Sequence, residues 1–292
     1  MTKLVCIGAG YSARPVAEEM RARGWDVAGT SRSDDGVAGL KARGLEAVRF
    51  ADGVVNDDLG VLLDAASHVL VSVAPDPDPA VGDSPLEPVR ARLAARATAP
   101  WVGYLSTVGV YGDHEGAWVG ETTAPRPASQ RSKARVAAET AWMDWADAAS
   151  APLQIYRLSG IYGPGRSPVD RLRAGKARRL VKPGQVFNRI HVDDIRAAVI
   201  AGLDGCGTHR VYNVTDDLPA PPQDVIAYAA DCLGIAPPPE IDFATADLSP
   251  MARSFYGENK RVANARMKDD LGVALSFPTY REGIAALAGI VG

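Results

Sequence analysis

Short apolar runs alternate with helical patterns through the first half of this chain. The runs expected to be buried strands are 3–7, 26–30, 46–50, 68–73 and 101–105. The helices expected near them are 12–23, 36–43 and 89–97. Strands that are separated by helices pair in parallel, with helices on both faces of the sheet. Since such crossovers are right-handed, the pattern predicts an α/β fold with a doubly wound parallel sheet.

This alternation weakens after residue 160. The elements expected in the later part of the chain are helices at 129–149, 192–203, 222–233 and 283–288 and strands at 153–158 and 211–214. We therefore expect a core at 1–160 and a smaller C-terminal substrate lid, mainly 161–292. A segment at about 190–215 is expected to return from the lid to the core.

The composition excludes several classes of protein. Of the 292 residues, 47% are apolar and 23% are charged, which is an ordinary globular balance. The net charge of −3 provides no basic excess for nucleic acid or for an anionic membrane, so we expect neither as a partner. Three scattered cysteines fit neither a disulfide framework nor a metal site. With no secretory or membrane-spanning pattern, we expect a cytoplasmic protein.

A glycine-rich turn follows the first expected strand and opens the first helix. Its residues 8–13, Gly-Ala-Gly-Tyr-Ser-Ala, fit the pattern G-x-G-x-x-A. Gly8 would allow the tight turn, Gly10 would let the backbone approach a pyrophosphate, and Ala13 would keep the helix close to the strand. The N-terminus of the helix adds partial positive charge beside Tyr11 and Ser12. The turn is therefore the expected dinucleotide site, and the alternative is a tight turn without a ligand.

The end of the second expected strand should select the cofactor. An acidic residue there would bind the ribose 2′-hydroxyl of NAD, but the strand is followed by Ser31 and Arg32. A hydroxyl and a guanidinium suit a 2′-phosphate, so we expect NADP. Asp34 and Asp35 lie slightly farther along and keep NAD open. Asp52, after the third strand, is expected either to accept a hydrogen bond from the adenine or to cap the next turn.

Four later segments resemble the extended short-chain dehydrogenases/reductases, which include NAD(P)-dependent epimerases and dehydratases. Leu-Ser-Thr-Val-Gly-Val-Tyr-Gly at 105–112 is similar to their S-[ST]-x-x-V-Y-G segment. The other three segments are 157–164, 190–194 and 211–214, similar to R-x-x-x-[IV]-Y-G-P, I-H-V-D-D and Y-N-V. The resemblance implies a Rossmann-type core that binds NAD(P), and it gives Thr107 the place of the catalytic Ser/Thr that bonds a substrate oxygen.

The chain departs from that family at its central catalytic pair, Tyr-x-x-x-Lys. The resemblance gives Lys133 the place of the lysine, which holds the nicotinamide ribose, but the place of the tyrosine is taken by Ser129. A serine hydroxyl is a poor acid or base, and we interpret Ser129 as a helix N-cap. Two further departures are the spacing of the glycine turn and Phe187, where sugar-nucleotide epimerases often carry arginine. The chain thus resembles the atypical branch of the superfamily.

Three functions remain open on this sequence. We favour NADP-dependent hydride transfer on a small polar or sugar-like substrate, in which Tyr162 or His114 could replace the missing tyrosine. The alternatives are a non-catalytic NADPH sensor and a scaffold that binds no cofactor. Trp142 and Trp145 lie three apart on the long helix, so they are expected to pack in the core or in the seam of a homodimer.

Overall fold

A seven-stranded parallel sheet organises the molecule, as the alternating pattern predicts. The computed structural model describes residues 2–78 and 80–290, so the outermost residues of the expected domain division, 1 and 291–292, lie outside it. In spatial order the strands are β11 (Val211–Val214), β7 (Leu153–Leu158), β5 (Trp101–Thr107), β4 (His68–Val71), β1 (Lys3–Ile7), β2 (Asp26–Ser31) and β3 (Glu46–Arg49). Neighbouring strands in this order pair in parallel. The doubly wound Rossmann-type prediction is confirmed.

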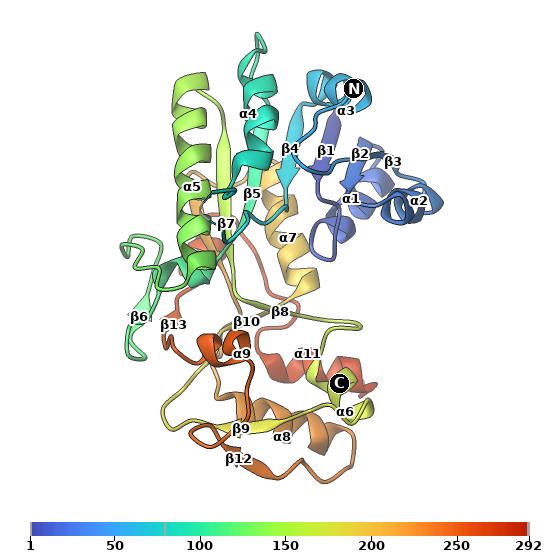
Figure 1. The fold of residues 1–292 in the computed structure, drawn as a ribbon. Helices are drawn as coiled ribbons and strands as arrows, with labels where there is room; N and C mark the ends of the chain where they lie inside the picture. The colour runs from blue at the N-terminus through green and yellow to red at the C-terminus, as the bar shows by residue number, and fades with distance from the viewer. Residues whose placement is uncertain (1, 79, 291–292) are drawn as a thin grey trace.

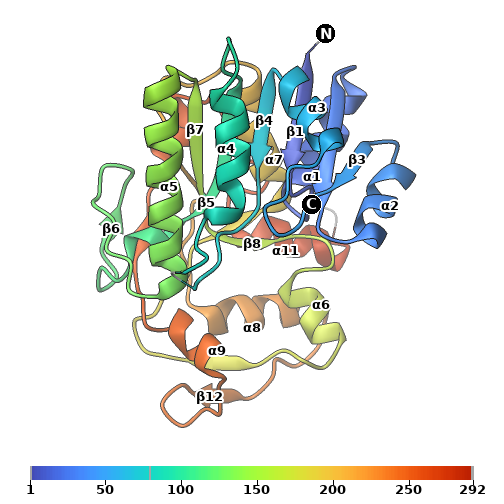
Figure 2. The same cartoon turned by 45° about the horizontal axis from the view of Figure 1, so that its top comes forward.

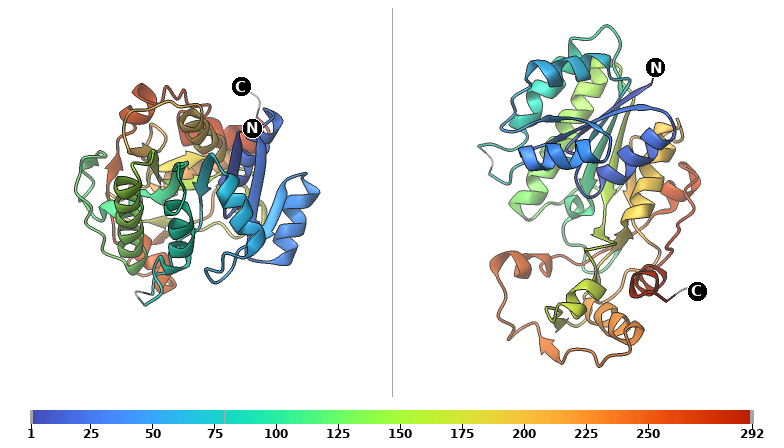
Figure 3. Two further views of the ribbon diagram at one scale, coloured as in Figure 1. Left: turned by 90° about the horizontal axis from the view of Figure 1, so that it is seen from above. Right: turned by 90° about the vertical axis from the view of Figure 1, so that its right-hand side faces the viewer.

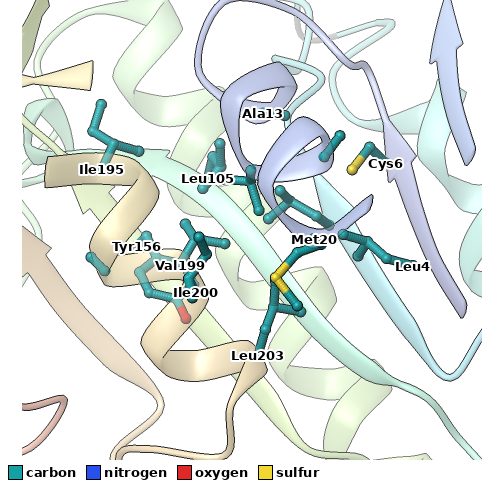
Figure 4. Close-up of a cluster of buried hydrophobic side chains, with 14 of the residues drawn as sticks. Leu4, Cys6, Ala13, Met20, Leu105, Tyr156, Ile195, Val199, Ile200 and Leu203 are labelled. Atoms are coloured by element: carbon teal, nitrogen blue, oxygen red, sulfur yellow. The ribbon is translucent and has the colours of Figure 1, made fainter. Parts of the chain in front are cut away.

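Helices cover both faces of this sheet (Figure 1). One face carries α3 (Asp57–Ala65), α4 (Glu87–Ala94) and α5 (Gln130–Ala149), and the other carries α1 (Ala13–Ala22), α2 (Asp34–Ala42) and α7 (Val192–Leu203). Side chains alternate along each strand, so that Leu4 and Cys6 pack towards α1 while Val5 and Ile7 pack towards α3 and α4. Figure 4 shows the first of these cores, where Met20 of α1 lies close to Leu203 of α7.

The helix α3 was not predicted from the sequence. Its leucines, Leu59, Leu62 and Leu63, are buried at helical spacing, and the Asn56 side chain caps the helix by accepting a hydrogen bond from Leu59 N at 3.0 Å. The interior Gly60 lowers the intrinsic helical preference of this segment by about 1 kcal/mol. The helix forms nevertheless, because its leucines pack in one cluster with Val89 and Leu93 of α4.

The later part of the chain forms a smaller layer below the carboxyl ends of the strands (Figures 1 and 2). Its helices are α6 (Pro168–Arg173), α8 (Pro222–Cys232), α9 (Pro250–Phe255) and α11 (Tyr280–Ala288), and its strands β9 (Arg179–Val181) and β12 (Glu240–Asp242) form a parallel pair. Seen from the side, this layer lies apart from most of the sheet and its helices (Figure 3). Within it, a separate apolar cluster joins α6, α8 and α11.

Two short parallel pairs connect the sheet region with this layer. They are β8 (Gly160–Tyr162) with β10 (Arg189–His191), and β6 (Trp118–Val119) with β13 (Arg261–Val262). The helix α7 and the strand β11 return to the sheet, and α10 (Ala265–Asp269) also packs against β11. The division at residue 160 stays a prediction. Among the helices in the described part of the chain, none is long and apolar enough to span a membrane.

Candidate functional site

The glycine-rich turn lies where the strand order changes direction. The strands β1, β2 and β3 follow one another towards one edge, whereas β4 pairs with the other side of β1. Ligands of open parallel sheets bind at such a switch point, beyond the carboxyl ends of the strands. Gly8 has φ +86°, and a Cβ there would lie 2.9 Å from Val73 Cγ2. A Cβ at Gly10 would meet no atom within 4 Å.

Hydrogen bonds hold this turn in place. Gly8 N donates to Thr30 Oγ1 at 2.8 Å and Ala9 N donates to Thr30 O at 2.9 Å. Ala13 is fully buried at the start of α1, as its role in helix–strand packing requires. The hydroxyl of Tyr11 donates to Pro164 O at 3.1 Å, so the turn also contacts the loop after β8.

Two arginines meet at the carboxyl ends of β2 and β3. Arg32 is exposed, and its carbonyl accepts a hydrogen bond from Arg49 Nε at 3.2 Å. Ser31 pairs with Arg49 in the register of the two strands. The sequence analysis missed Arg49, although its place at the end of an expected strand was a usable signal.

Acidic residues beside these strands are also exposed. Asp34 and Asp35 open α2 behind its cap Ser33. Asp52 follows β3 with φ +53°. Asp52 lies in the turn that Val54 N closes by donating to Ala51 O at 3.1 Å, and the helix after this turn is capped by Asn56. Both roles expected of Asp52 stay predictions.

Thr107 is the last residue of β5 and is half-buried. Its Oγ1 accepts a hydrogen bond from Gly109 N at 3.1 Å and caps the short 3₁₀ helix η2 (Val108–Tyr111). The side chain therefore lies at the same edge of the sheet as the glycine turn, two strands away from β1.

A buried network lies beneath this edge. Glu139 of α5 and Arg157 of β7 form an ion pair at 2.6 Å, with side chains that are 4% and 5% exposed. Ser106 donates to Glu139 at 2.6 Å. Tyr111 accepts from Arg157 at 3.0 Å and donates to Asn213 at 2.7 Å. The segments containing Ser106, Arg157 and Asn213 are thus brought together around one buried ion pair.

Comparisons with known proteins agree with this arrangement. Protein YeeZ of Escherichia coli is 31% identical to this chain over 290 residues, which cover 95% of this chain and 97% of YeeZ. A functionally unknown conserved protein from Silicibacter pomeroyi DSS has a solved structure that is 46% identical, with a TM-score of 0.85 over 99% of both chains. This chain belongs to the extended short-chain dehydrogenase/reductase superfamily. No protein-family model matches it.

The fold is shared more widely within this superfamily. The structure of UDP-glucuronic acid 4-epimerase from Bacillus cereus, in complex with NAD, matches 99% of this chain and 98% of that chain. The TM-score is 0.79, but only 16% of the residues are identical. At this sequence identity the similarity establishes the fold alone and does not establish the chemistry of this chain.

The helix α5 lacks the tyrosine of the superfamily's catalytic pair, Tyr-x-x-x-Lys. Ser129 is its N-cap: Oγ accepts from Ser132 N at 3.1 Å and donates to Ser132 Oγ at 2.9 Å. Lys133 is exposed, whereas Arg135 donates to Leu105 O at 2.8 Å. The basic side chain that contacts the end of β5 is therefore Arg135. Helical spacing was the missed signal, because Arg135 shares a face with Ser132 and Glu139, and Lys133 does not.

The hydroxyl of Tyr162 is directed at the start of α11. Tyr162 is 5% exposed, and its hydroxyl donates to Thr279 O at 3.5 Å, beside α11. Burial raises the pKa of this phenol, which weakens it further as a proton carrier. The structure therefore does not favour Tyr162 as the acid or base.

Neither His114 nor His191 is placed as a clear replacement for the missing catalytic tyrosine. His114 is half-buried, with Nε2 3.1 Å from Tyr111 O. His191 caps α7 by accepting from Asp193 N at 3.2 Å, and burial lowers its pKa. Asp194, in the first turn of α7, accepts a hydrogen bond from Ser276 N at 2.7 Å.

A buried carboxyl group and a half-buried arginine lie on neighbouring segments between β11 and the lower layer, where Asp216 N donates to Arg189 O at 2.7 Å. Arg189, two residues after Phe187, donates to Phe187 O at 2.9 Å and to Ala220 O at 3.1 Å. Asp216 is 1% exposed, and its burial raises its pKa to about 8, partly opposed by the charge of Arg189. Asp216 was not among the predicted site residues, although it lies two residues after the Y-N-V strand.

Proposed function

We propose that this protein binds NADP at the turn formed by residues 8–13, in a cytoplasmic setting. The observation that carries the proposal is the glycine turn at the switch point, where Gly8 requires positive φ and Gly10 leaves the backbone open. The NAD complex of the Bacillus cereus epimerase, which shares this fold, supports a nicotinamide dinucleotide as the ligand.

The cofactor is proposed to be NADP because of the residues at the end of β2. Ser31 and the exposed Arg32 would bind the 2′-phosphate, and a guanidinium can do so with two parallel hydrogen bonds. Asp52, also exposed, would accept from the adenine amino group. These roles require no rearrangement of buried side chains.

The reaction we propose is hydride transfer on a small polar or sugar-like substrate. When bound, the cofactor supplies or accepts the hydride. Thr107 would orient the substrate oxygen from the end of β5, while a base of α5 holds the nicotinamide ribose. The exposed Lys133 is one candidate for that role, and Arg135, which donates to Leu105 O at 2.8 Å, is the other.

A second candidate is an NADPH sensor without turnover. The observation that favours it is the environment of the nearby hydroxyls: Ser129 is committed to capping α5, while Tyr111 and Tyr162 are buried in hydrogen-bonded positions. A screen of aldehydes, ketones and sugar nucleotides with NADPH and NADP distinguishes the two candidates. Tight cofactor binding with no turnover in the screen would favour the sensor.

Arg32→Ala tests the cofactor assignment. Loss of a charged hydrogen-bond donor costs about 1.5–3 kcal/mol, so we expect NADPH affinity to fall about 10- to 100-fold while NADH affinity changes little. Dissociation constants from fluorescence titration of wild type and variant measure this directly. Equal weakening of both nucleotides would refute the role of Arg32.

A further inference from the structure

We infer that Arg49, at the end of β3, is a second ligand of the 2′-phosphate and determines the preference for NADP. This inference rests on the proposed function. Arg49 and Ser31 are register partners on neighbouring parallel strands, so both side chains leave the sheet at the same level. The Arg49 side chain is 57% exposed, which leaves it accessible to a ligand.

The contacts of Arg49 aim it at the turn after β2. Its Nε donates to Arg32 O at 3.2 Å, which holds the backbone of the residue expected to bind the phosphate. A guanidinium has five N–H donors, and only the Nε donor is engaged by a hydrogen bond among the described residues. Arg49 can therefore position Arg32 and still bind an anion itself.

Arg49 also lies beside the acid that would favour NAD. Its Nη1 is 3.8 Å from Asp34 Oδ2, and the Asp34 side chain is 86% exposed. Asp34 keeps NAD open because a carboxylate can accept hydrogen bonds from a ribose 2′-hydroxyl. The nearby positive charge of Arg49 offsets this carboxylate, which would otherwise repel a phosphate.

Through these contacts, Arg49 has two effects that both strengthen the binding of NADPH. Arg49 attracts the 2′-phosphate and weakens the repulsion by Asp34. Since NADH has no 2′-phosphate, neither effect should strengthen its binding. The structure thus assigns the preference for NADP to two arginines, Arg32 and Arg49, at the ends of neighbouring strands. The side chain of Arg49 contacts the main chain of Arg32.

Arg49→Ala is the variant that tests this inference. We expect the dissociation constant for NADPH to rise about 10- to 100-fold, as for other charged hydrogen bonds, and that for NADH to stay within about twofold. Adenosine 2′,5′-bisphosphate and 5′-AMP, used as competing probes, isolate the 2′-phosphate: only the first should bind more weakly to the variant. Arg49→Lys, which retains the charge but lacks the planar fork, should restore part of the affinity.

Arg43→Ala is a matched control. Arg43 lies at the other end of α2, is 51% exposed and pairs with Glu18 at 3.2 Å, so its loss removes the same charge from the same region. We expect this variant to keep the wild-type ratio of NADPH to NADH affinity. An equal change in both arginine variants would show a general charge effect and overturn the inference.

The remaining outcomes separate this inference from the proposed function. If wild type prefers NADPH and Arg49→Ala retains that preference, the role of Arg49 is refuted while the proposed function stands. If wild type binds neither nucleotide, the proposed function is refuted, and the inference with it. Equal weakening of NADPH and NADH by Arg49→Ala would indicate a structural role and would also overturn the inference.

Discussion

The carboxyl group of Asp216 lies where burial favours its protonated form. It follows β11 and has one oxygen within 3.3 Å of Leu218 N, while burial raises its pKa to about 8. An unfolded chain would give this group a pKa near 3.9. Between these two values the native protein binds more protons at this site than the unfolded chain does. Asp216 must therefore stabilise the fold less as the pH rises.

Asp216→Asn makes this dependence measurable. The asparagine cannot ionise, so the stability of wild type relative to the variant should fall as the pH rises from 5 to 7, by at most about 1.4 kcal/mol per pH unit. Urea unfolding of both proteins at pH 5, 6 and 7 gives the two profiles. Parallel profiles would show that Asp216 is already ionised in the native protein.

At the scale of elements, α5 combines structural and site-forming residues. Trp142 and Trp145 point inward and pack against each other at 5.6 Å between ring centroids, so they form core rather than a dimer seam. Lower on the same helix, Glu139 binds Arg157 and Arg135 reaches β5. The N-cap Ser129 begins the helix beside η2, and this cap was correctly predicted from the sequence.

Ser129→Ala separates the cap from catalysis. Loss of a serine N-cap costs about 1 kcal/mol of protein stability, and we expect that loss with no change in NADPH affinity. Thermal or urea unfolding gives the first quantity, and titration gives the second. Turnover, once a substrate is known, should fall no more than the folded fraction does. A larger fall would give the Ser129 hydroxyl a part in the reaction.

At the scale of the whole molecule, the parallel sheet and the glycine turn could be predicted because each depends on local patterns. Apolar runs, turn glycines and helix caps act over a few residues, and β1, β5 and β7 were found by them. The residues that complete the edge were missed, because a local signal marks a position without showing what its side chain contacts. Arg49, Arg135 and Asp216 lie far apart in the sequence, and the roles of the first two depend on strand register and helix face.

The lower layer also depends on contacts that local sequence patterns do not reveal. The pairing of β8 with β10 brings together two segments that resemble the superfamily, but nothing in either segment specifies the other as its partner. Tyr162 looked available in the sequence, yet it lies in β8, and α11, from the end of the chain, covers its hydroxyl. Non-local packing therefore decided which candidate side chains remain accessible.

The central claim is that the glycine turn binds a dinucleotide with a 2′-phosphate. Separate titrations of the purified protein with NADPH and NADH, followed by energy transfer from tryptophan to the nicotinamide, test it most directly. We expect saturable binding of NADPH that is at least about tenfold tighter than that of NADH, as one charged hydrogen bond would give. Equal affinities or a preference for NADH would contradict the assignment of Arg32 and Arg49, and binding of neither would contradict the dinucleotide site itself.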